Sequence, residues 1–269
     1  WSEPQFERYA NGRPIKHPRA ANFAWRCENG NYLYWFHNHG GTWYEDRNPV
    51  WLCGGVEVDS PEGRIIQWSQ PEIGLYDDDT YIRMSYPDLV EDRGNYYLLE
   101  TQKDKARVHL LDESLLQGMW QQFDDEGTVV NEACVLEFNQ WQASVDVPSF
   151  PAFNKRSTDR ADHGSEDLRA GFSLELWFQL DSLDPLQSLL DSRSDNGQGL
   201  CLQTSDKGTI EIILNDGRTE SCWDSDPDAV QAGKLHHMAV IVDGGPKLIT
   251  FIVDGVLCDG GDYRQFGWG

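Results

Sequence analysis

Arg83-Met-Ser-Tyr-Pro-Asp-Leu-Val-Glu-Asp-Arg-Gly-Asn-Tyr-Tyr-Leu-Leu-Glu100 is the stretch that decides the fold. Two runs rich in aromatic and β-branched residues flank a Gly94-Asn95 turn, a pattern typical of a β-hairpin. The first run sets Tyr86 at the end of a short strand. The second strand ends at Glu100, a charge at an otherwise apolar position. The sequence therefore predicts a hairpin that directs a phenol and a carboxylate towards one place.

This hairpin resembles the Tyr-Ser-Asp-Leu and Leu-Leu-Tyr-Glu signature of the sialidase superfamily of six-bladed β-propellers, with Pro87 where the family usually has Ser. The resemblance implies that Tyr86 is the nucleophile of a retaining exo-glycosidase. It also implies that Glu100 orients one of three arginines that bind the substrate carboxylate. The family's first arginine and its acid/base aspartate belong to earlier blades, which this chain does not contain.

A second stretch resembles the same family. Asp46-Arg47-Asn48-Pro49 precedes a strand, a turn, and Ile65-Ile66-Gln67-Trp68-Ser69-Gln70-Pro71, similar to a degenerate Asp-box. The resemblance covers about residues 1–125 and implies that Arg47 is the third arginine of the triad. A guanidinium suits that role because its planar fork binds a carboxylate through two hydrogen bonds. A surface ion pair with Glu45 or Asp46 is the alternative reading of Arg47.

A tyrosine nucleophile makes chemical sense beside an anionic substrate. A carboxylate nucleophile would be repelled by the substrate's own carboxylate, whereas a neutral phenol activated by a nearby base would not. Glu28 and Glu57 are candidates for that base. A tyrosine at a blade edge is the structural alternative for Tyr86.

Further residues complete the expected pocket. Arg83 and Glu57 are reserve members, and His37 and His39 lie two apart on a strand, so both imidazoles point to one face. Substrate hydrogen bonding suits that pair better than metal binding, because no third ligand is at hand. Calcium would need oxygen ligands from several segments, beyond the acidic run 77–79, and no motif supports any cofactor.

The N-terminal region reads as antiparallel strands joined by short turns. The pairings expected are Arg64–Trp68 with Val50–Val58, and Ser85–Val90 with Tyr96–Thr101, with one short helix after them. The full set of expected elements is strands Tyr32–His39, Val50–Val58, Arg64–Trp68, Arg83–Val90, Tyr96–Thr101 and Ala106–Leu111, and helix Glu113–Trp120.

A different strand pattern begins at Ala133. The run Gly233-Lys-Leu-His-His-Met-Ala-Val-Ile-Val-Asp243, followed by Ile252-Val-Asp-Gly255, resembles the laminin-G-like, concanavalin-type jelly roll, with Leu235 in place of the usual Trp. The resemblance covers roughly 133–269. Alternation on strands within 172–255 predicts a sandwich core built on Phe172, Leu174, Leu176, Phe178, Ile210, Ile212, Leu214, Ala239, Ile241 and Phe251.

The fold class expected is all-β: a partial β-propeller of sialidase-like blades over residues 1–128, then a laminin-G-like β-sandwich over 129–269. The first region is too short to close a propeller alone. We therefore expect the chain to be a portion of a longer protein whose remaining parts are its partners.

Charge and cysteine usage narrow the function. With 45 acidic and 22 basic residues among 269, the net charge is −23, which excludes the basic footprint of a nucleic-acid binder. No apolar run approaches the ~20 residues of a membrane span. The six cysteines lack zinc spacing. Cys201 and Cys222 could form a disulfide, or each could be a buried thiol. An extracellular or periplasmic location is slightly favoured.

Two functions follow from these patterns. The first is a sialidase-like exo-glycosidase with an appended carbohydrate-recognition sandwich, acting on a glycan or glycoconjugate. The second is a non-catalytic carbohydrate- or protein-binding β module of a larger extracellular or surface protein. A structural role is a third reading, without a motif behind it.

Overall fold

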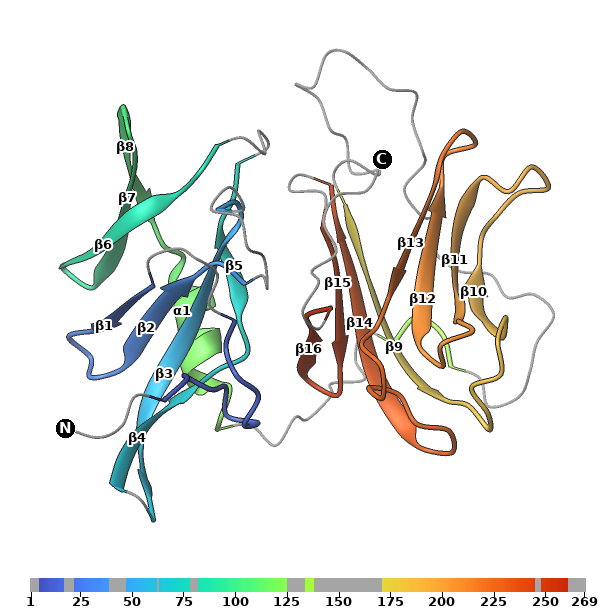
Figure 1. Ribbon diagram of the computed structural model, residues 1–269, viewed down its shortest axis with the longest axis horizontal. Coiled ribbons are helices and arrows are strands. Elements are labelled where there is room, and N and C mark those ends of the chain that lie inside the picture. Colours follow the sequence, from blue (N-terminus) through green and yellow to red (C-terminus); the bar gives the residue numbers. More distant parts are fainter. Residues whose placement is uncertain are drawn as a thin grey trace.

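A computed structural model gives the fold of the chain. It describes residues 5–16, 22–38, 47–61, 63–77, 82–124, 134–137, 171–244 and 248–260. The expected domain boundary at 125–132 and the start of the second pattern at Ala133 lie outside these residues. Within them, no helix is long and apolar enough to cross a membrane. The described residues form an N-terminal part (5–124) and a sandwich (171–260), both built on antiparallel sheets (Figure 1).

The N-terminal part holds two antiparallel sheets and one helix. One sheet has the order β1-β2-β3-β4, with β5 also pairing with β3, and the other has the order β6-β7-β8. The elements are β1 (Phe23–Arg26), β2 (Tyr32–Phe36), β3 (Val50–Ser60), β4 (Gly63–Trp68), β5 (Glu72–Leu75), β6 (Ser85–Asp92), β7 (Asn95–Gln102), β8 (Lys105–Leu110) and α1 (Glu113–Gln121).

Both predicted strand pairings are confirmed. β3 pairs antiparallel with β4, with Val58 opposite Ile65, and β6 pairs antiparallel with β7, with Val90 opposite Tyr97. Alternation and short turns sufficed here because each pair is a local hairpin. The described strands form open sheets and no closed ring of blades, so the all-β class is confirmed and the propeller is not.

The predicted helix is also confirmed, as α1. Asp112 caps it, accepting a hydrogen bond from the Ser114 amide at 2.7 Å. Leu116, Met119 and Trp120 are buried on the face that meets β3. A Cβ at Gly54 of β3 would lie 2.8 Å from the Met119 Cβ, so the glycine is what lets the helix approach the strand this closely.

Two four-stranded antiparallel sheets form the sandwich. Their orders are β10-β11-β12-β13 and β16-β15-β14-β9. The strands are β9 (Phe172–Gln179), β10 (Ser188–Asp191), β11 (Gly199–Thr204), β12 (Ile210–Asn215), β13 (Glu220–Asp224), β14 (Leu235–Asp243), β15 (Leu248–Val253) and β16 (Val256–Cys258). The apolar core lies between the two sheets, which lie side by side in the view of Figure 1.

The predicted core of the sandwich is confirmed except on β14. There the buried set is Met238, Val240 and Val242, and the predicted Ala239 and Ile241 face the other way. The register explains the error: Met238 lies opposite Leu176, and partners in an antiparallel pair share a face. Because the run Met-Ala-Val-Ile-Val is apolar at every position, alternation alone could not choose its parity.

The disulfide considered between Cys201 and Cys222 is not formed. Both residues lie opposite Ile213 of β12, one on each side of that strand, so an entire strand separates them. Two strand spacings amount to roughly 9–10 Å, beyond the reach of a disulfide. The cysteines in the described residues are free thiols, and Cys201 is fully buried. The prediction failed because it placed the two cysteines on neighbouring strands, whereas β12 lies between their strands, β11 and β13.

The N-terminal part and the sandwich are in direct contact through β15 and β16. Leu257 is buried in a cluster with Trp51 and other aromatic residues of β2 to β4. Polar contacts frame this cluster: Arg13 Nη1 donates to the Leu257 carbonyl and Lys16 Nζ to the Asp259 carbonyl, each at 2.8 Å. The β16 side of this sheet's outer face is thus covered, whereas β9 lies at the opposite edge.

Candidate functional site

Tyr86 lies at an irregularity at the start of β6. The register between β6 and β7 shifts between Ser85 and Asp88, and Tyr86 has a φ of 50°, in the left-handed region that a tyrosine rarely adopts. A bulge of this kind redirects a side chain away from the regular alternation. The Tyr86 side chain is 67% exposed, so its phenol is accessible to a ligand.

Arg47 is held directly beside this irregularity. Its Nη1 donates to the Ser85 Oγ at 2.8 Å, and its carbonyl accepts from the Met84 amide at 3.2 Å. Its Nε is buried and has no hydrogen-bond partner among the described residues. Arg47 therefore contacts Ser85, the residue before Tyr86, and it keeps one buried donor for a further acceptor.

Glu100 is fully buried on the inner face of β7. Its Oε1 accepts from the Arg107 Nε and lies 3.4 Å from the His109 Nε2. Arg107 in turn forms an ion pair with Asp77, with 3.2 Å between Nη1 and Oδ2. A buried carboxylate needs such compensation, because an unpaired charge in the interior is strongly unfavourable.

The structure thus pairs Glu100 with Arg107, not with Arg47. The two segments are nevertheless linked, because Asn48 and Asp77 exchange hydrogen bonds of 2.7 and 3.1 Å between side chain and main chain. Arg107 and His109 were absent from the predicted site. The turn Lys103-Asp104 fixes the register that sets Arg107 opposite Glu100, so hairpin geometry could have found this partner from sequence.

The structure separates two of the remaining predicted residues, His37 and Glu57, from Tyr86. His37 is 1% exposed, with its Nδ1 3.4 Å from the Pro49 carbonyl, so it does not face a ligand. Glu57 lies along β3, roughly 23 Å beyond Val50 by strand geometry. There it accepts from the Tyr32 hydroxyl and from Arg64. Arg83 is half-buried just before β6, and His39 lies outside the described residues.

The predicted base for Tyr86 is not found among the described residues. Glu57 is bonded to a different phenol, that of Tyr32, at 2.7 Å, and this hydrogen bond lowers the pKa of Glu57 while raising that of Tyr32. The main-chain amide of Glu28 donates to the Glu91 carboxylate. Among the described residues, no carboxylate is hydrogen-bonded to the Tyr86 hydroxyl.

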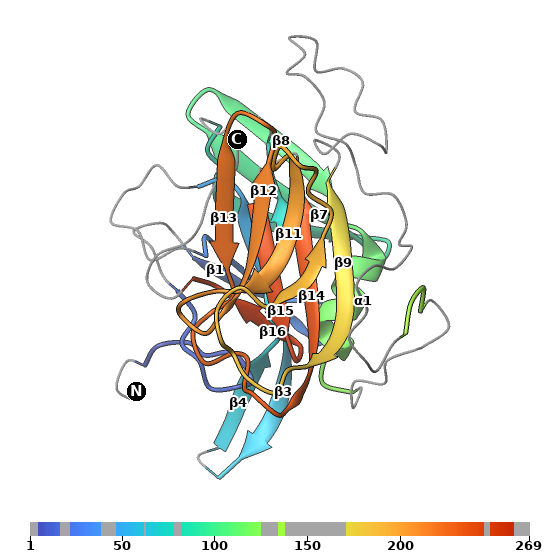
Figure 2. The ribbon, with the colours of Figure 1, turned by 90° about the vertical axis from the view of Figure 1, so that its right-hand side faces the viewer.

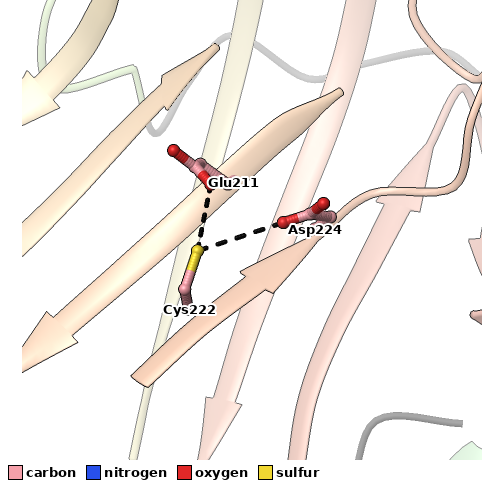
Figure 3. A group of neighbouring side chains, drawn as sticks. All are labelled: Glu211, Cys222 and Asp224. Atoms are coloured by element: carbon pink, nitrogen blue, oxygen red, sulfur yellow. Dashed lines mark hydrogen bonds between the residues drawn. The ribbon is translucent and has the colours of Figure 1, made fainter. Parts of the chain in front are cut away.

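A second polar group lies on the outer face of the β10–β13 sheet. Figure 3 shows Glu211 of β12 beside Cys222 and Asp224 of β13, with the thiol donating to the Glu211 carboxylate at 3.0 Å. Burial, then the bond to Glu211 and the nearby carboxylates, raise the pKa of Cys222 to about 12. A protonated thiol is a poor metal ligand, and Lys207 already neutralises Asp224 at 2.6 Å.

The junction between the two parts encloses a cavity of about 30 Å³. Trp51 lines it from the N-terminal part, and Leu257 and Asp259 line it from the sandwich. Such a volume holds about one water molecule, far below the size of a sugar-binding pocket. This cavity is therefore too small to be a glycan site.

Comparison with known proteins identifies the second half of the chain. Residues 155–267 match the model of the family described as the concanavalin A-like lectin/glucanases superfamily. No curated protein matches the chain. The two packed antiparallel sheets over 172–258 agree with this match. The predicted concanavalin-type jelly roll is thereby confirmed: the C-terminal region of this chain is similar to the concanavalin A-like lectin/glucanases superfamily.

Proposed function

We propose that this chain is a carbohydrate-binding β module, in which the sandwich supplies recognition. The observation that carries the proposal is the match of residues 155–267 to the concanavalin A-like lectin/glucanases superfamily. The fold alone does not fix an activity. Binding fits the sandwich because groups of polar side chains lie on its open outer sheet faces, where a glycan can reach them.

Charge restricts the glycan class. The net charge of −23 gives the chain a repulsive field towards polyanions such as sulfated glycans. Carboxylate groups on the sandwich surface suit neutral sugars, whose hydroxyls donate hydrogen bonds to them. Neutral oligosaccharides are therefore the expected ligands of the sandwich.

A glycan array with the purified chain tests this function. The expected result is retention of neutral oligosaccharides, with no reducing sugar released from the same glycans over a long incubation. Rapid release of sugar would replace the binding function with a hydrolase. Failure to retain any glycan, by a chain shown to be folded by circular dichroism, would refute the proposal.

A second candidate function is sialidase-like hydrolysis with retention of configuration, and the Arg47–Tyr86 geometry favours it. The exposed Tyr86 phenol would lose its proton and attack the anomeric carbon, and the bond from that carbon to the aglycone oxygen would break. The aglycone would leave with a proton taken from solvent, and water would then cleave the glycosyl–tyrosine bond. Arg47, with its unpaired buried Nε, would bind the sugar carboxylate. The base that takes the phenol proton is not among the contacts of the described residues.

Release of a chromogenic sialoside tests this second function. Wild-type chain and Tyr86→Phe should differ by several orders of magnitude in rate, because the phenyl ring cannot form the covalent bond. Arg47→Ala should raise the KM for the sialoside while leaving release of a neutral chromogenic galactoside unchanged. Equal activity of wild type and Tyr86→Phe would remove Tyr86 from the chemistry.

A further inference from the structure

The outer face of β9 and β14 carries an uncommon set of side chains. On β9 the inward residues are apolar, so Glu175, Trp177 and Gln179 point away from the core. On β14 the partner of Trp177 is His237, which therefore lies on the same outer face. An indole, an imidazole and a carboxylate are thus adjacent on an open sheet face.

The contacts within this group are well defined. The rings of Trp177 and His237 lie 4.8 Å apart between centroids, tilted by 41°. The His237 Nε2 is 2.8 Å from the Glu175 Oε1, and the His237 main-chain amide donates to the Asp254 Oδ1 at 3.0 Å. The bond to Glu175 and the contact with the indole orient the imidazole, so the group is organised before any ligand arrives.

Trp177 is exposed in a way the other tryptophans are not. Its exposed fraction is 47%, whereas Trp35, Trp51 and Trp68 are each at most 3% exposed. Among the tryptophans that the structure describes, it is the one classed with the exposed large apolar residues. An exposed indole on a sheet strand presents a flat apolar face on which another molecule can pack.

The position of the group also leaves it accessible. The N-terminal part contacts the sheet through β15 and β16, where Ile252 and Leu257 join its apolar cluster. β9 is the opposite edge of the same sheet. Figure 2 shows β9 along the outer side of the sandwich, away from β16. The docking of the two parts therefore covers one half of this outer face and leaves the half with Trp177 open.

We propose that Trp177, His237 and Glu175 form the binding platform for a neutral pyranose. The apolar C–H face of the ring stacks on the indole, and the ring hydroxyls donate to the Glu175 carboxylate and exchange hydrogen bonds with His237. Glu175 disfavours sugars that carry a carboxylate, because two like charges would approach each other. The inference rests on the proposed carbohydrate-binding function and assigns its site and sugar class.

The decisive measurement is isothermal titration calorimetry of the full chain with three probes: cellohexaose, laminarihexaose and 3′-sialyllactose. At least one neutral hexasaccharide should bind, and more tightly than sialyllactose. Trp177→Ala should weaken that binding about tenfold or more, because the stacking surface is lost. The affinity of Trp177→Phe should lie between those of wild type and Trp177→Ala, because the smaller ring can still stack on the sugar.

Leu186→Ala is the matched control. Leu186 belongs to the same sandwich and is more exposed than Trp177, at 74%, but lacks an aromatic face. The Leu186→Ala variant should bind the neutral hexasaccharide with the affinity of wild type. If Trp177→Ala does not reach the native circular dichroism spectrum, Trp177→Gln and Trp177→Phe carry the test.

The outcomes separate the two claims. Binding of a neutral probe that survives Trp177→Ala unchanged overturns the platform and leaves the carbohydrate-binding function in place. Tighter binding of sialyllactose that depends on Trp177 overturns the neutral sugar class. No binding of any probe by the folded wild-type chain overturns both the function and the platform.

Discussion

The N-terminal part and the sandwich cover their sheets in different ways. In the sandwich, two four-stranded sheets cover each other, and the residues of the core between them are apolar. In the N-terminal part, a helix lies against β3 and the inner face of β7 includes the buried carboxylate of Glu100. Charges of the sandwich lie on outer faces, as with Glu175 and Asp224.

This difference indicates where binding chemistry depends on the fold. A buried charge must be compensated by a partner on a neighbouring strand, so Glu100, Arg107 and Asp77 form one network with the backbone. An exposed charge can be changed without disturbing the core. The candidate site of the N-terminal part should therefore be sensitive to substitution, and the sandwich surface tolerant.

The largest effect is expected for Glu100→Gln. The substitution leaves the largely buried Arg107 guanidinium without its main counter-charge, and it should destabilise the fold by about 3 kcal/mol. Urea unfolding measures it. Glu57→Gln, which removes an exposed carboxylate paired with Arg64, is the control and should leave the urea midpoint unchanged. Equal midpoints for the two variants would remove the contrast between buried and exposed charge.

A somewhat smaller effect is expected for Gly54→Ala. The new Cβ would meet the Met119 Cβ at 2.8 Å and the Trp120 Cδ1 at 2.9 Å, so the helix must move away from β3. Overpacking of this kind costs about 1–3 kcal/mol, and the thermal midpoint should fall accordingly. Gly118→Ala on the same helix meets nothing within 4 Å and should stabilise by about 0.5–1 kcal/mol. A loss of stability in both variants would contradict the close helix–strand approach.

Sequence predicted the local features of both parts and failed on the longer-range ones. The hairpins β3–β4 and β6–β7 and helix α1 follow from alternation and turn residues close in the chain. Which side chains of β14 face the core depends on its pairing with β9, about 60 residues away. A run that is apolar at every position does not reveal that pairing.

The candidate site shows the same division. Arg47 and Tyr86 were identified through a resemblance, and the structure brings their segments together. His37 was included for its two-residue spacing from His39, and Glu57 as a possible base. Burial of His37 and the distance of Glu57 along β3 separate them from Tyr86. Trp177 was not singled out from the sequence, because exposure on a sheet face depends on which strands lie beside it.

On the sandwich, Asp254→Asn should lower the free energy of unfolding by about 1 kcal/mol. The effect is small because the Asp254 side chain is 37% exposed and its hydrogen bonds are partly screened. Burial would raise the pKa of Asp254, but the His237 amide, His236 and Lys234 together hold it below its usual value. Because this pKa is lower in the folded chain than in the unfolded chain, where it is about 3.9, the ionised carboxylate stabilises the fold above that pH. The stabilisation is lost as the pH falls through the pKa of the folded chain. The difference between the unfolding midpoints of wild type and variant should therefore be larger at pH 7 than at pH 3. A constant difference would contradict this assignment.

The smallest effect concerns reactivity and not stability. Cys222 is exposed, yet the pKa of about 12 keeps its thiol protonated. At pH 8 its iodoacetamide alkylation should therefore be about a hundredfold slower in the folded chain than in the unfolded chain, after allowing for the greater nucleophilicity of a more basic thiolate. Mass spectrometry of the Cys222 peptide follows the rate.

Glu211→Gln should speed this alkylation, because it removes the carboxylate that accepts the thiol proton at 3.0 Å. Glu220→Gln is the matched control and should leave the alkylation rate unchanged. Glu220 lies on the same strand as Cys222, but its carboxylate accepts a hydrogen bond from Asn215. Equal rates in folded and unfolded wild type would show that the carboxylates on this face do not hold the proton on Cys222. The exposed charges of the sandwich would then act independently of one another, unlike the buried charges around Glu100.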